Sequence, residues 1–369
     1  MLKIKRIDEF KYVLEENPFY VDGKGGQLGD RGKIGDANIV EITENFIVLD
    51  KKLEDGYYCY EIDIERQKDI AQQHSAQHIF SAEAYNKFSL NTVGFRMGEE
   101  YSTVDLDSKE ITKETIVQLE EFVNVAINKD IQVEEMIYTN SEAHKLTNLR
   151  KQIKEKIKGD VRFIKISDID ICACAGFHVN KTSEIKIFKI IGTEVIRGTW
   201  TRFFFLAGNR AVNDYNFKHG VTKRLSNIFS CKTDEILEML DKSLKEKERI
   251  EYEYKNLSYK YAENLAKELE KNCLEYENKK IVIYNENKNI SDILPRYINL
   301  NEYVLFSGFD KNYTFVSNVI DCQKVIKKII QNYPEIKGGG SPKKGNLKLD
   351  KIYEINELEK IIKKSIQDI

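Results

Sequence analysis

Long apolar runs are missing from this 369-residue sequence, which argues against a helical membrane protein. A transmembrane helix needs about 20 consecutive apolar residues, and no uninterrupted apolar stretch approaches that length. The opening residues, Met1-Leu-Lys-Ile-Lys-Arg6, carry charges where a signal peptide would have its apolar core. We therefore expect a cytoplasmic globular protein that makes no membrane contact.

Cysteine is also scarce, and the six cysteines are dispersed except for Cys172 and Cys174. This distribution argues against a disulfide framework and favours a reducing compartment with one metal or reactive-thiol site. An excess of positive charge is missing as well, because the formal net charge is −2. A generally basic coat for nucleic acid is therefore not expected, although a local basic face remains compatible with this charge.

Two of the five histidines, His74 and His78, lie four residues apart in a stretch that reads as a helix. This spacing places both imidazoles on one face, one turn apart, where they can bind a single ion. Taken alone, such a pair is more often an ordinary polar or half-buried pair than a metal site. A second motif therefore has to support the metal interpretation.

That second motif is Cys174 and His178, which are also four residues apart. Three imidazoles and a thiolate suit Zn²⁺ better than Mg²⁺ or Ca²⁺, which prefer oxygen ligands. Cys172 is an alternative ligand, because in an extended segment it lies on the same face as Cys174. We choose Cys174 because its spacing to His178 matches that of the histidine pair. A closed structural zinc and an open catalytic zinc both remain possible.

Glycine is concentrated near the N-terminus, where five of the residues from 23 to 32 are glycine. This density predicts either tight turns in a small β-barrel or a loop that faces a ligand. Short strands with alternating apolar positions surround it, and from about residue 66 the pattern becomes mixed helix and strand.

The C-terminal third has a different organisation. Residues 233–271 contain no proline or glycine and carry a heptad-like apolar seam, which predicts a helical spacer or a dimer contact. Further on, Gly338, Gly339 and Gly340 are flanked by lysines and predict either a phosphate-cradling loop or a flexible one. We expect an α+β protein with a β-barrel at 1–65, a zinc-containing domain at 66–225, a helical linker at 226–275 and an α/β domain at 276–369.

The order of these motifs resembles a known family. His-x-x-x-His followed by Cys-x-x-x-His is similar to the editing domain of alanyl-tRNA synthetase and to the free-standing AlaX-type alanyl-tRNA editing proteins. Gly25-Gly26-Gln27 with Asp30-x-Gly32 resembles the family's N-terminal glycine motif, and the stretches 98–107, 197–203 and 208–211 extend the match from about residue 10 to 220. The C-terminal part resembles the DHH-associated domain of the long AlaX proteins. No adenylation region precedes the match, so we expect an enzyme that acts in trans.

The resemblance implies hydrolysis of serine or glycine wrongly attached to alanine tRNA. A synthetase pocket rejects glycine weakly, because one methyl group is worth about 1–3 kcal/mol, so a second site must remove the product. By the same resemblance His74, His78, Cys174 and His178 hold one zinc ion per chain. The resemblance also implies a substrate pocket that comprises Gly25, Gly26, Gln27, Asp30, Arg96 and Phe177.

Two residues depart from the family pattern. Phe177 is bulkier than the threonine expected between Cys174 and His178, and Arg96 stands where a smaller polar residue or histidine is expected. Two alternatives therefore stay open: a non-catalytic tRNA-binding protein with a structural zinc, and a deacylase with shifted amino-acid specificity. The resemblance also implies a homodimer through the linker and C-terminal domain. The RNA contacts that we expect are Arg202, Gly338, Gly339, Gly340, Lys343 and Lys344.

Overall fold

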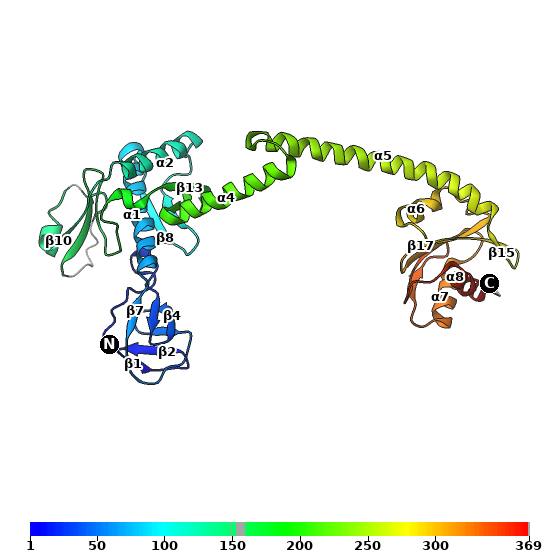
Figure 1. Ribbon diagram of the computed structural model, residues 1–369, viewed down its shortest axis with the longest axis horizontal. Coiled ribbons are helices and arrows are strands. Elements are labelled where there is room, and N and C mark those ends of the chain that lie inside the picture. The colour runs from blue at the N-terminus through cyan, green and yellow to red at the C-terminus, as the bar shows by residue number, and fades with distance from the viewer. Residues whose placement is uncertain (148, 153–158, 368–369) are drawn as a thin grey trace. The chain divides into compact units, whose positions relative to one another are not determined.

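The computed structural model of the chain describes residues 1–147, 149–152 and 159–367. The chain divides into two units, Met1–Arg224 and Leu225–Ile369 (Figure 1). No helix in these described ranges combines the length and the apolar character needed to cross a bilayer.

The first unit begins with a seven-stranded sheet in the order β6-β1-β2-β5-β4-β3-β7, which curls into a nearly closed barrel. Its centre is apolar and includes Tyr12, whose hydroxyl accepts a hydrogen bond from the Leu53 amide at 2.7 Å. The predicted α+β class with an N-terminal β-barrel is thus confirmed. The barrel strands are β1 Leu2–Arg6, β2 Lys11–Leu14, β3 Gly32–Ile34, β4 Ala37–Ile42, β5 Ile47–Leu49, β6 Gly56–Tyr58 and β7 Tyr60–Ile62.

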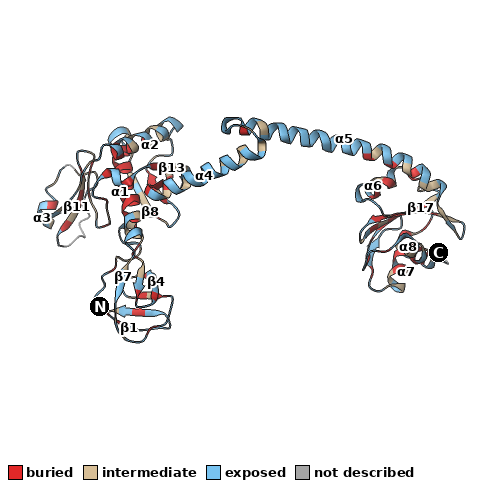
Figure 2. Cartoon of the chain, viewed as in Figure 1, coloured by how far each residue is buried: buried red, intermediate tan, exposed pale blue. Residues whose placement is uncertain are grey.

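Helix α1 (Ile64–Phe88) is the centre of the rest of this unit. Asp63 caps its N-terminus, because the Asp63 side chain accepts a hydrogen bond from the Arg66 amide at 2.9 Å. Ser89 caps its C-terminus in the left-handed conformation. Every residue from 70 to 84 is buried, and Figure 2 shows this part of α1 in red. A helix buried on all faces has to satisfy its polar side chains inside the protein, and these include both histidines.

A four-stranded sheet in the order β13-β14-β9-β8 packs against α1, and α2 (Lys113–Asn128) packs beside it. Phenylalanines join the layers, because the Phe80 ring lies 5.2 Å from Phe203 and 5.6 Å from Phe188 between centroids. The strands are β8 Thr92–Met97, β9 Ser102–Leu106, β13 Phe188–Ile196 and β14 Trp200–Ala207. We predict from its apolar run that β14 is buried on both faces. In the structure its burial alternates from Trp200 to Phe205, because one face of this antiparallel sheet is only partly covered.

A separate three-stranded sheet, β10-β11-β12, carries the Cys/His motif. Its strands are β10 Val133–Tyr138, β11 Val161–Ile166 and β12 Asp170–Ala173, so Cys174 follows directly after β12. Helix α3 (Asn140–Ala143) lies between β10 and β11 in the sequence, and α4 (Gly208–Phe229) follows β14.

The second unit contains the long helix α5 (Ile236–Lys271) and a six-stranded sheet in the order β15-β16-β17-β18-β20-β19. Apolar side chains of the predicted seam, such as Leu240, Ile250 and Leu257, are exposed on α5 (Figure 2). Its role as spacer or dimer contact stays a prediction, as do the four domain boundaries. The other elements are β15 Leu274–Tyr276, β16 Lys279–Tyr284, α6 Lys288–Ile293, β17 Tyr303–Phe309, β18 Asn312–Val316, α7 Cys322–Asn332, β19 Lys337–Gly340, β20 Lys344–Lys348 and α8 Ile355–Ile366.

The glycine cluster of the second unit is a strand, so the expectation of a loop at Gly338, Gly339 and Gly340 is wrong. These residues form β19, which pairs antiparallel with β20. Glycine is needed for the close approach of the two strands, because a Cβ atom on Gly340 would lie 2.3 Å from the Gly345 Cα. The two strands form a hairpin in which only residues 341–343 separate β19 from β20, and a run of three glycines does not by itself indicate a strand.

Candidate metal centre

The two helix histidines share one face of α1, as their spacing predicts, with ring centroids 5.3 Å apart. In each histidine the Nδ1 atom forms a hydrogen bond with a side-chain oxygen from another part of the chain. His74 Nδ1 lies 2.8 Å from Gln27 Oε1, and His78 Nδ1 lies 2.9 Å from Asp170 Oδ2. Because Nδ1 donates to an oxygen acceptor, Nε2 of each ring is left with its lone pair free.

The Cys/His turn is held in place by hydrogen bonds from two directions. Arg162 donates from one guanidinium nitrogen to the carbonyls of Cys174 and Gly176, at 3.0 and 2.8 Å. On the α1 side, Ser75 Oγ accepts from the Val179 amide at 3.1 Å and lies 3.1 Å from His178 Nδ1. His178 is therefore oriented by an oxygen at Nδ1 in the same way as the two helix histidines.

The four side chains converge on one point. Cys174 Sγ lies 3.3 Å from His178 Nε2 and 3.5 Å from His74 Nε2, and one donor atom from each of the four residues lies within 4.8 Å of the others. His74 and His78 are buried and the other two are half-buried. We call this group, His74, His78, Cys174 and His178, the cluster. Its inward-facing nitrogen and sulfur donors can hold one metal ion.

The electrostatics of three of the four cluster residues, Cys174, His74 and His178, favour the protonation states that bind metal. Burial raises the pKa of Cys174, but hydrogen bonds from His178, His74 and His78 outweigh this and lower it to about 2. Burial lowers the pKa of His74, and burial together with the neighbouring imidazoles lowers the pKa of His178 to about 3. Burial opposes the charged form of His78 too, but hydrogen bonds with Asp170 and Cys174 raise its pKa to about 9. A thiolate and neutral imidazoles are the metal-binding forms, so the residues fit a metal ion whose binding releases the proton of His78.

Cys172, the alternative ligand, lies outside the cluster. Its thiol is buried, and burial raises its pKa to about 11. The turn after β12 therefore brings Cys174, and not Cys172, to the three imidazoles.

This difference predicts a distinct reactivity for the two thiols. In metal-free protein at pH 6, iodoacetamide is expected to alkylate Cys174 but not Cys172, because only the group whose pKa is lowered is a thiolate at this pH. Added metal ion should protect Cys174. Peptide mass spectrometry from pH 5 to 9 checks this: a Cys174 rate that rises tenfold per pH unit would contradict the lowered pKa.

A cavity of about 560 Å³ opens beside the cluster. His74, His78 and Cys174 form one wall, and Gly25 and Gly26 belong to the lining, as predicted. Further lining comes from Gln77, Thr92, Val93, Gly94, Phe95, Arg150, Lys151, Gln152, Cys172, Ala173 and Ala175. The predicted pocket residue Gln27 lies behind this wall, where its Oε1 atom accepts from His74 Nδ1 and from the Phe177 amide at 3.0 Å.

The other three predicted pocket residues, Asp30, Arg96 and Phe177, are not part of this lining among the described residues. Asp30 is buried and accepts hydrogen bonds from the Tyr20 amide and from Gln67 Nε2, both at 2.8 Å. The side chain of Arg96 is exposed on β8, and the Phe177 ring packs against Tyr20 with centroids 4.9 Å apart.

The residues predicted to contact RNA lie in three places. Arg202 forms a two-bond ion pair with Asp105 at 2.7 and 2.9 Å. In the second unit, Gly338 and Gly339 line a cavity of about 650 Å³ together with Lys288, Lys337 and Lys348. Gly340, Lys343 and Lys344 are not part of the lining of that cavity in the described part of the chain.

Sequence reasoning missed the residues that orient the cluster. Asp170 is buried, accepts from His78, and also forms a two-bond ion pair with Arg150 at 2.7 and 3.1 Å. Burial raises the pKa of Asp170, but the hydrogen bond with His78 and the charge of Arg150 bring it below its ordinary value. The alternation Asp170-x-Cys172-x-Cys174 was a usable signal, because it places the carboxylate on the same strand face as the thiols. Nothing in the sequence pointed to Ser75, Arg150 or Arg162.

Part of the chain matches a known family, and curated relatives extend the similarity. Residues 161–203 match the family described as the threonyl and alanyl tRNA synthetase second additional domain. The chain is 31% identical over 240 residues to the alanyl-tRNA editing protein Aarsd1 of Bos taurus, covering 63% of this chain and 53% of that protein. It is 25% identical over 356 residues to the alanyl-tRNA editing protein AlaX-L of Pyrococcus horikoshii, and this match covers 91% of this chain and 87% of that protein. An alanine–tRNA ligase of Thermoanaerobacter is 26% identical over 371 residues, and this match covers 91% of this chain and 41% of the ligase. The chain thus spans about half the length of its Aarsd1 relative.

Proposed function

We propose, from its relationship to the AlaX-type alanyl-tRNA editing proteins and to the editing domain of alanyl-tRNA synthetase, that this chain is an aminoacyl-tRNA deacylase. Its substrate is alanine tRNA that carries serine or glycine, and the bond it hydrolyses is the ester to the terminal ribose. The observation that carries this proposal is the cluster, three of whose four residues open onto a cavity of about 560 Å³.

The metal is zinc in this proposal, with one ion per chain. Three imidazole nitrogens and one thiolate are a donor set typical of zinc sites. Bound at the cluster, zinc would supply a Lewis acid next to the ester.

The protein's own residues orient the reacting groups. Gln27 Oε1 accepts from both His74 Nδ1 and the Phe177 amide, which fixes the direction of its amide group. Its Nε2 atom is then a buried donor that has no hydrogen-bond partner in the described part of the chain. Because Gln27 is only 1% exposed and lies behind the cavity wall, we assign it the orientation of His74 and not a contact with the substrate.

The proton acceptor comes from the substrate or the solvent. The described residues that line the cavity include no carboxylate, and the two histidines in the wall belong to the cluster. We therefore assign proton removal to the free hydroxyl of the terminal ribose or to solvent.

The cavity lining suits a small amino acid with a polar side chain. Thr92 and Gln77 contribute polar groups, and both donate hydrogen bonds to Ser81 Oγ, at 2.7 and 2.8 Å. Such a lining can recognise the serine hydroxyl, which alanine lacks. Because Arg96 and Phe177 lie outside the lining, their departure from the family pattern gives no reason to shift the specificity.

The partner in this proposal is alanine tRNA. Lys151 lies beside the cavity, where it can meet the phosphates of the acceptor end. We keep 66–225 as the editing domain, α5 as the element of a homodimer and the second unit as a further tRNA contact. The reaction takes place in the cytoplasm, where alanine tRNA is charged.

A second candidate is a tRNA-binding protein that does not catalyse hydrolysis. One feature of the cluster favours this candidate. Its four protein donors would fill a tetrahedral zinc site and leave no coordination position for water or substrate, as in structural zinc sites.

Release of labelled amino acid from Ser-, Gly- and Ala-charged alanine tRNA separates the two functions. A deacylase releases serine or glycine and spares alanine, by a factor of at least about 100 if the serine hydroxyl is recognised. No release of any of the three by zinc-loaded protein that still binds the tRNA would overturn the proposed substrate. A wider panel of charged tRNAs then separates the binding protein, which releases none, from a deacylase with shifted amino-acid specificity.

A further inference from the structure

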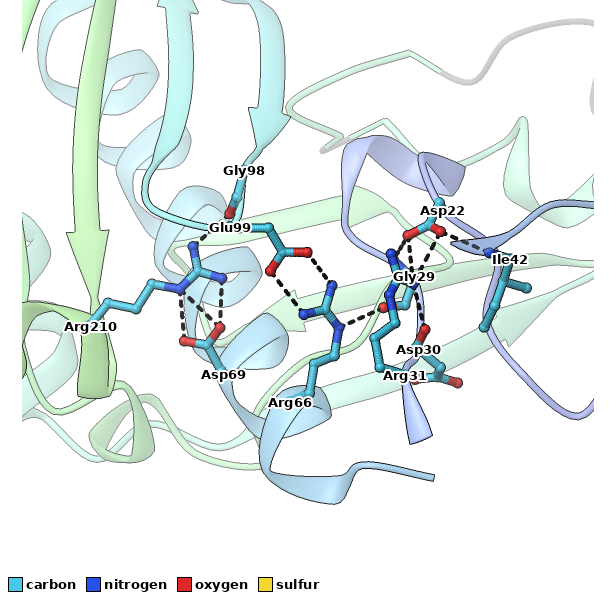
Figure 3. Close-up of polar contacts among 10 residues, drawn as sticks. All are labelled: Asp22, Gly29, Asp30, Arg31, Ile42, Arg66, Asp69, Gly98, Glu99 and Arg210. Carbon is cyan, nitrogen blue, oxygen red and sulfur yellow. Dashed lines mark hydrogen bonds and ion pairs between the residues drawn. The ribbon is translucent and has the colours of Figure 1, made fainter. Parts of the chain in front are cut away.

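Three arginines of the first unit, Arg31, Arg66 and Arg210, each join a carboxylate to a backbone carbonyl (Figure 3). Arg31 contacts Asp22 and the Asp30 carbonyl, and Arg210 contacts Asp69 and the Gly98 carbonyl. The middle arginine, Arg66, lies in the first turns of α1 and is only 15% exposed.

Arg66 holds two segments that are far apart in the sequence. Its terminal nitrogens donate to the two carboxylate oxygens of Glu99 at 2.9 and 2.7 Å, and its Nε atom donates to the Gly29 carbonyl at 3.0 Å. Glu99 lies in the turn between β8 and β9, and Gly29 lies in the glycine-rich loop. Arg66 therefore joins α1, the β8–β9 turn and the glycine-rich loop at one point.

The same three segments meet a second time at His74. The glycine-rich loop reaches it through Gln27 Oε1, at 2.8 Å from Nδ1. Strand β8 reaches it through Phe95, whose ring stacks on the imidazole with centroids 5.4 Å apart and an interplanar angle of 23°. Phe95 also covers the loop, because a Cβ atom on Gly26 would lie 3.0 Å from the Phe95 ring.

The distance along the chain excludes a direct role for Arg66. It precedes His74 by eight residues on one helix, which is about 12 Å at 1.5 Å per residue. Gly29 is two residues from Gln27, and Glu99 is four residues from Phe95. If the bonds of Arg66 are lost, a movement of Gly29 or Glu99 therefore reaches Gln27 or Phe95 through a short stretch of chain.

We propose that Arg66 is a positioning residue for the deacylation: its bonds to Glu99 and Gly29 keep Gln27 and Phe95 in register with His74. The expected effect on kcat rests on the proposed function. The expected effect on the positions of Gln27 and Phe95 does not, because it can be measured without tRNA. The planar fork of arginine is required, because a lysine ammonium cannot pair with both Glu99 oxygens and the Gly29 carbonyl at once.

The test uses Arg66→Lys in the full-length, zinc-loaded protein. The Phe177 amide reports on Gln27, because it donates to Gln27 Oε1, and its hydrogen exchange can be measured without tRNA. We expect exchange at Phe177 to accelerate about tenfold or more, because the opening of a local hydrogen bond becomes more favourable. With misacylated tRNA we expect kcat to fall about 10- to 100-fold while KM changes little, as a small misplacement of a catalytic group predicts. Zinc content should stay at one per chain.

Arg249→Lys is the matched control. Arg249 forms the same two-bond fork with Glu246, at 2.9 and 2.6 Å, on the exposed surface of α5. We expect it to leave both Phe177 exchange and kcat unchanged.

Glu99→Gln decides the matter if Arg66→Lys does not fold. The Glu99 side chain is 59% exposed, so its amide variant should fold, and it breaks the two-bond pairing while Arg66 remains. Unchanged Phe177 exchange in whichever folded variant is measured would overturn the positioning role. A wild-type protein that fails to hydrolyse the ester would instead overturn the proposed function, and the exchange result would still stand.

Discussion

Replacing Cys174 with alanine is expected to empty the metal centre and to abolish ester hydrolysis. The thiolate is the one sulfur ligand of the cluster, and it lies within 3.5 Å of two imidazole nitrogens. Loss of a residue that merely orients a ligand typically costs 10- to 100-fold in metal affinity or activity. Loss of the ligand itself should cost more, so we expect a fall in hydrolysis of at least about 100-fold. Metal analysis of the purified variant should find far less than one zinc per chain.

Cys172→Ala is the control for this experiment, because it makes the same substitution two residues away. Cys172 is buried but lies outside the cluster. Because Cys172 also lines the cavity, zinc content is the control readout: we expect a modest loss of stability with one zinc per chain retained. If Cys172→Ala loses the metal and Cys174→Ala keeps it, the assignment of the ligand is wrong.

The second large effect is expected for Asp170→Asn. This substitution keeps the shape of the side chain but removes the charge that faces Arg150, and it leaves one acceptor oxygen where His78 and Arg150 together use two. The side chain of Asp170 is 0% exposed and that of Arg150 is 11% exposed, so the arginine would be left as an unpaired buried charge. Breaking a buried ion pair from one side typically costs about 3–5 kcal/mol, and loss of the carboxylate behind a histidine ligand costs about 10- to 100-fold in metal affinity.

Two measurements separate these consequences. Urea unfolding of the metal-free protein reports the ion pair, and competition with a chelator reports the metal affinity. Asp105→Asn is a suitable control, because it breaks the two-bond pair with Arg202, whose side chain is 36% exposed, and leaves the cluster untouched. An Asp170→Asn protein as stable as wild type, with unchanged zinc affinity, would contradict the role of Asp170 as the partner of His78.

The cluster could be predicted because its four residues lie in two short motifs of the sequence. His74 and His78 are four positions apart, as are Cys174 and His178, and this spacing corresponds to one helical turn or one tight turn. What brings the two motifs together is long-range packing of β12 against α1, which local spacing does not contain. For the same reason the choice between Cys172 and Cys174 depends on the direction of the chain after β12.

The residues that orient the cluster could not be predicted in this way. Gln27 reaches His74 across 47 positions, and Ser75 reaches His178 across 103. The prediction of a loop at Gly338, Gly339 and Gly340 was wrong for a different reason: glycine has a low strand propensity, and here it forms one strand of a hairpin, in which Gly340 pairs with Gly345. Asp30 and Phe177 were assigned to the pocket by resemblance, but the structure places them in the packing around the glycine-rich loop.

The role of the cluster can be measured by hydrolysis of serine-charged alanine tRNA with one preparation of the protein in three states: as purified, after chelation and after zinc is restored. We expect rapid release of serine, loss of release on chelation and recovery with one zinc per chain. Release that survives complete removal of the metal would contradict the central role of the cluster.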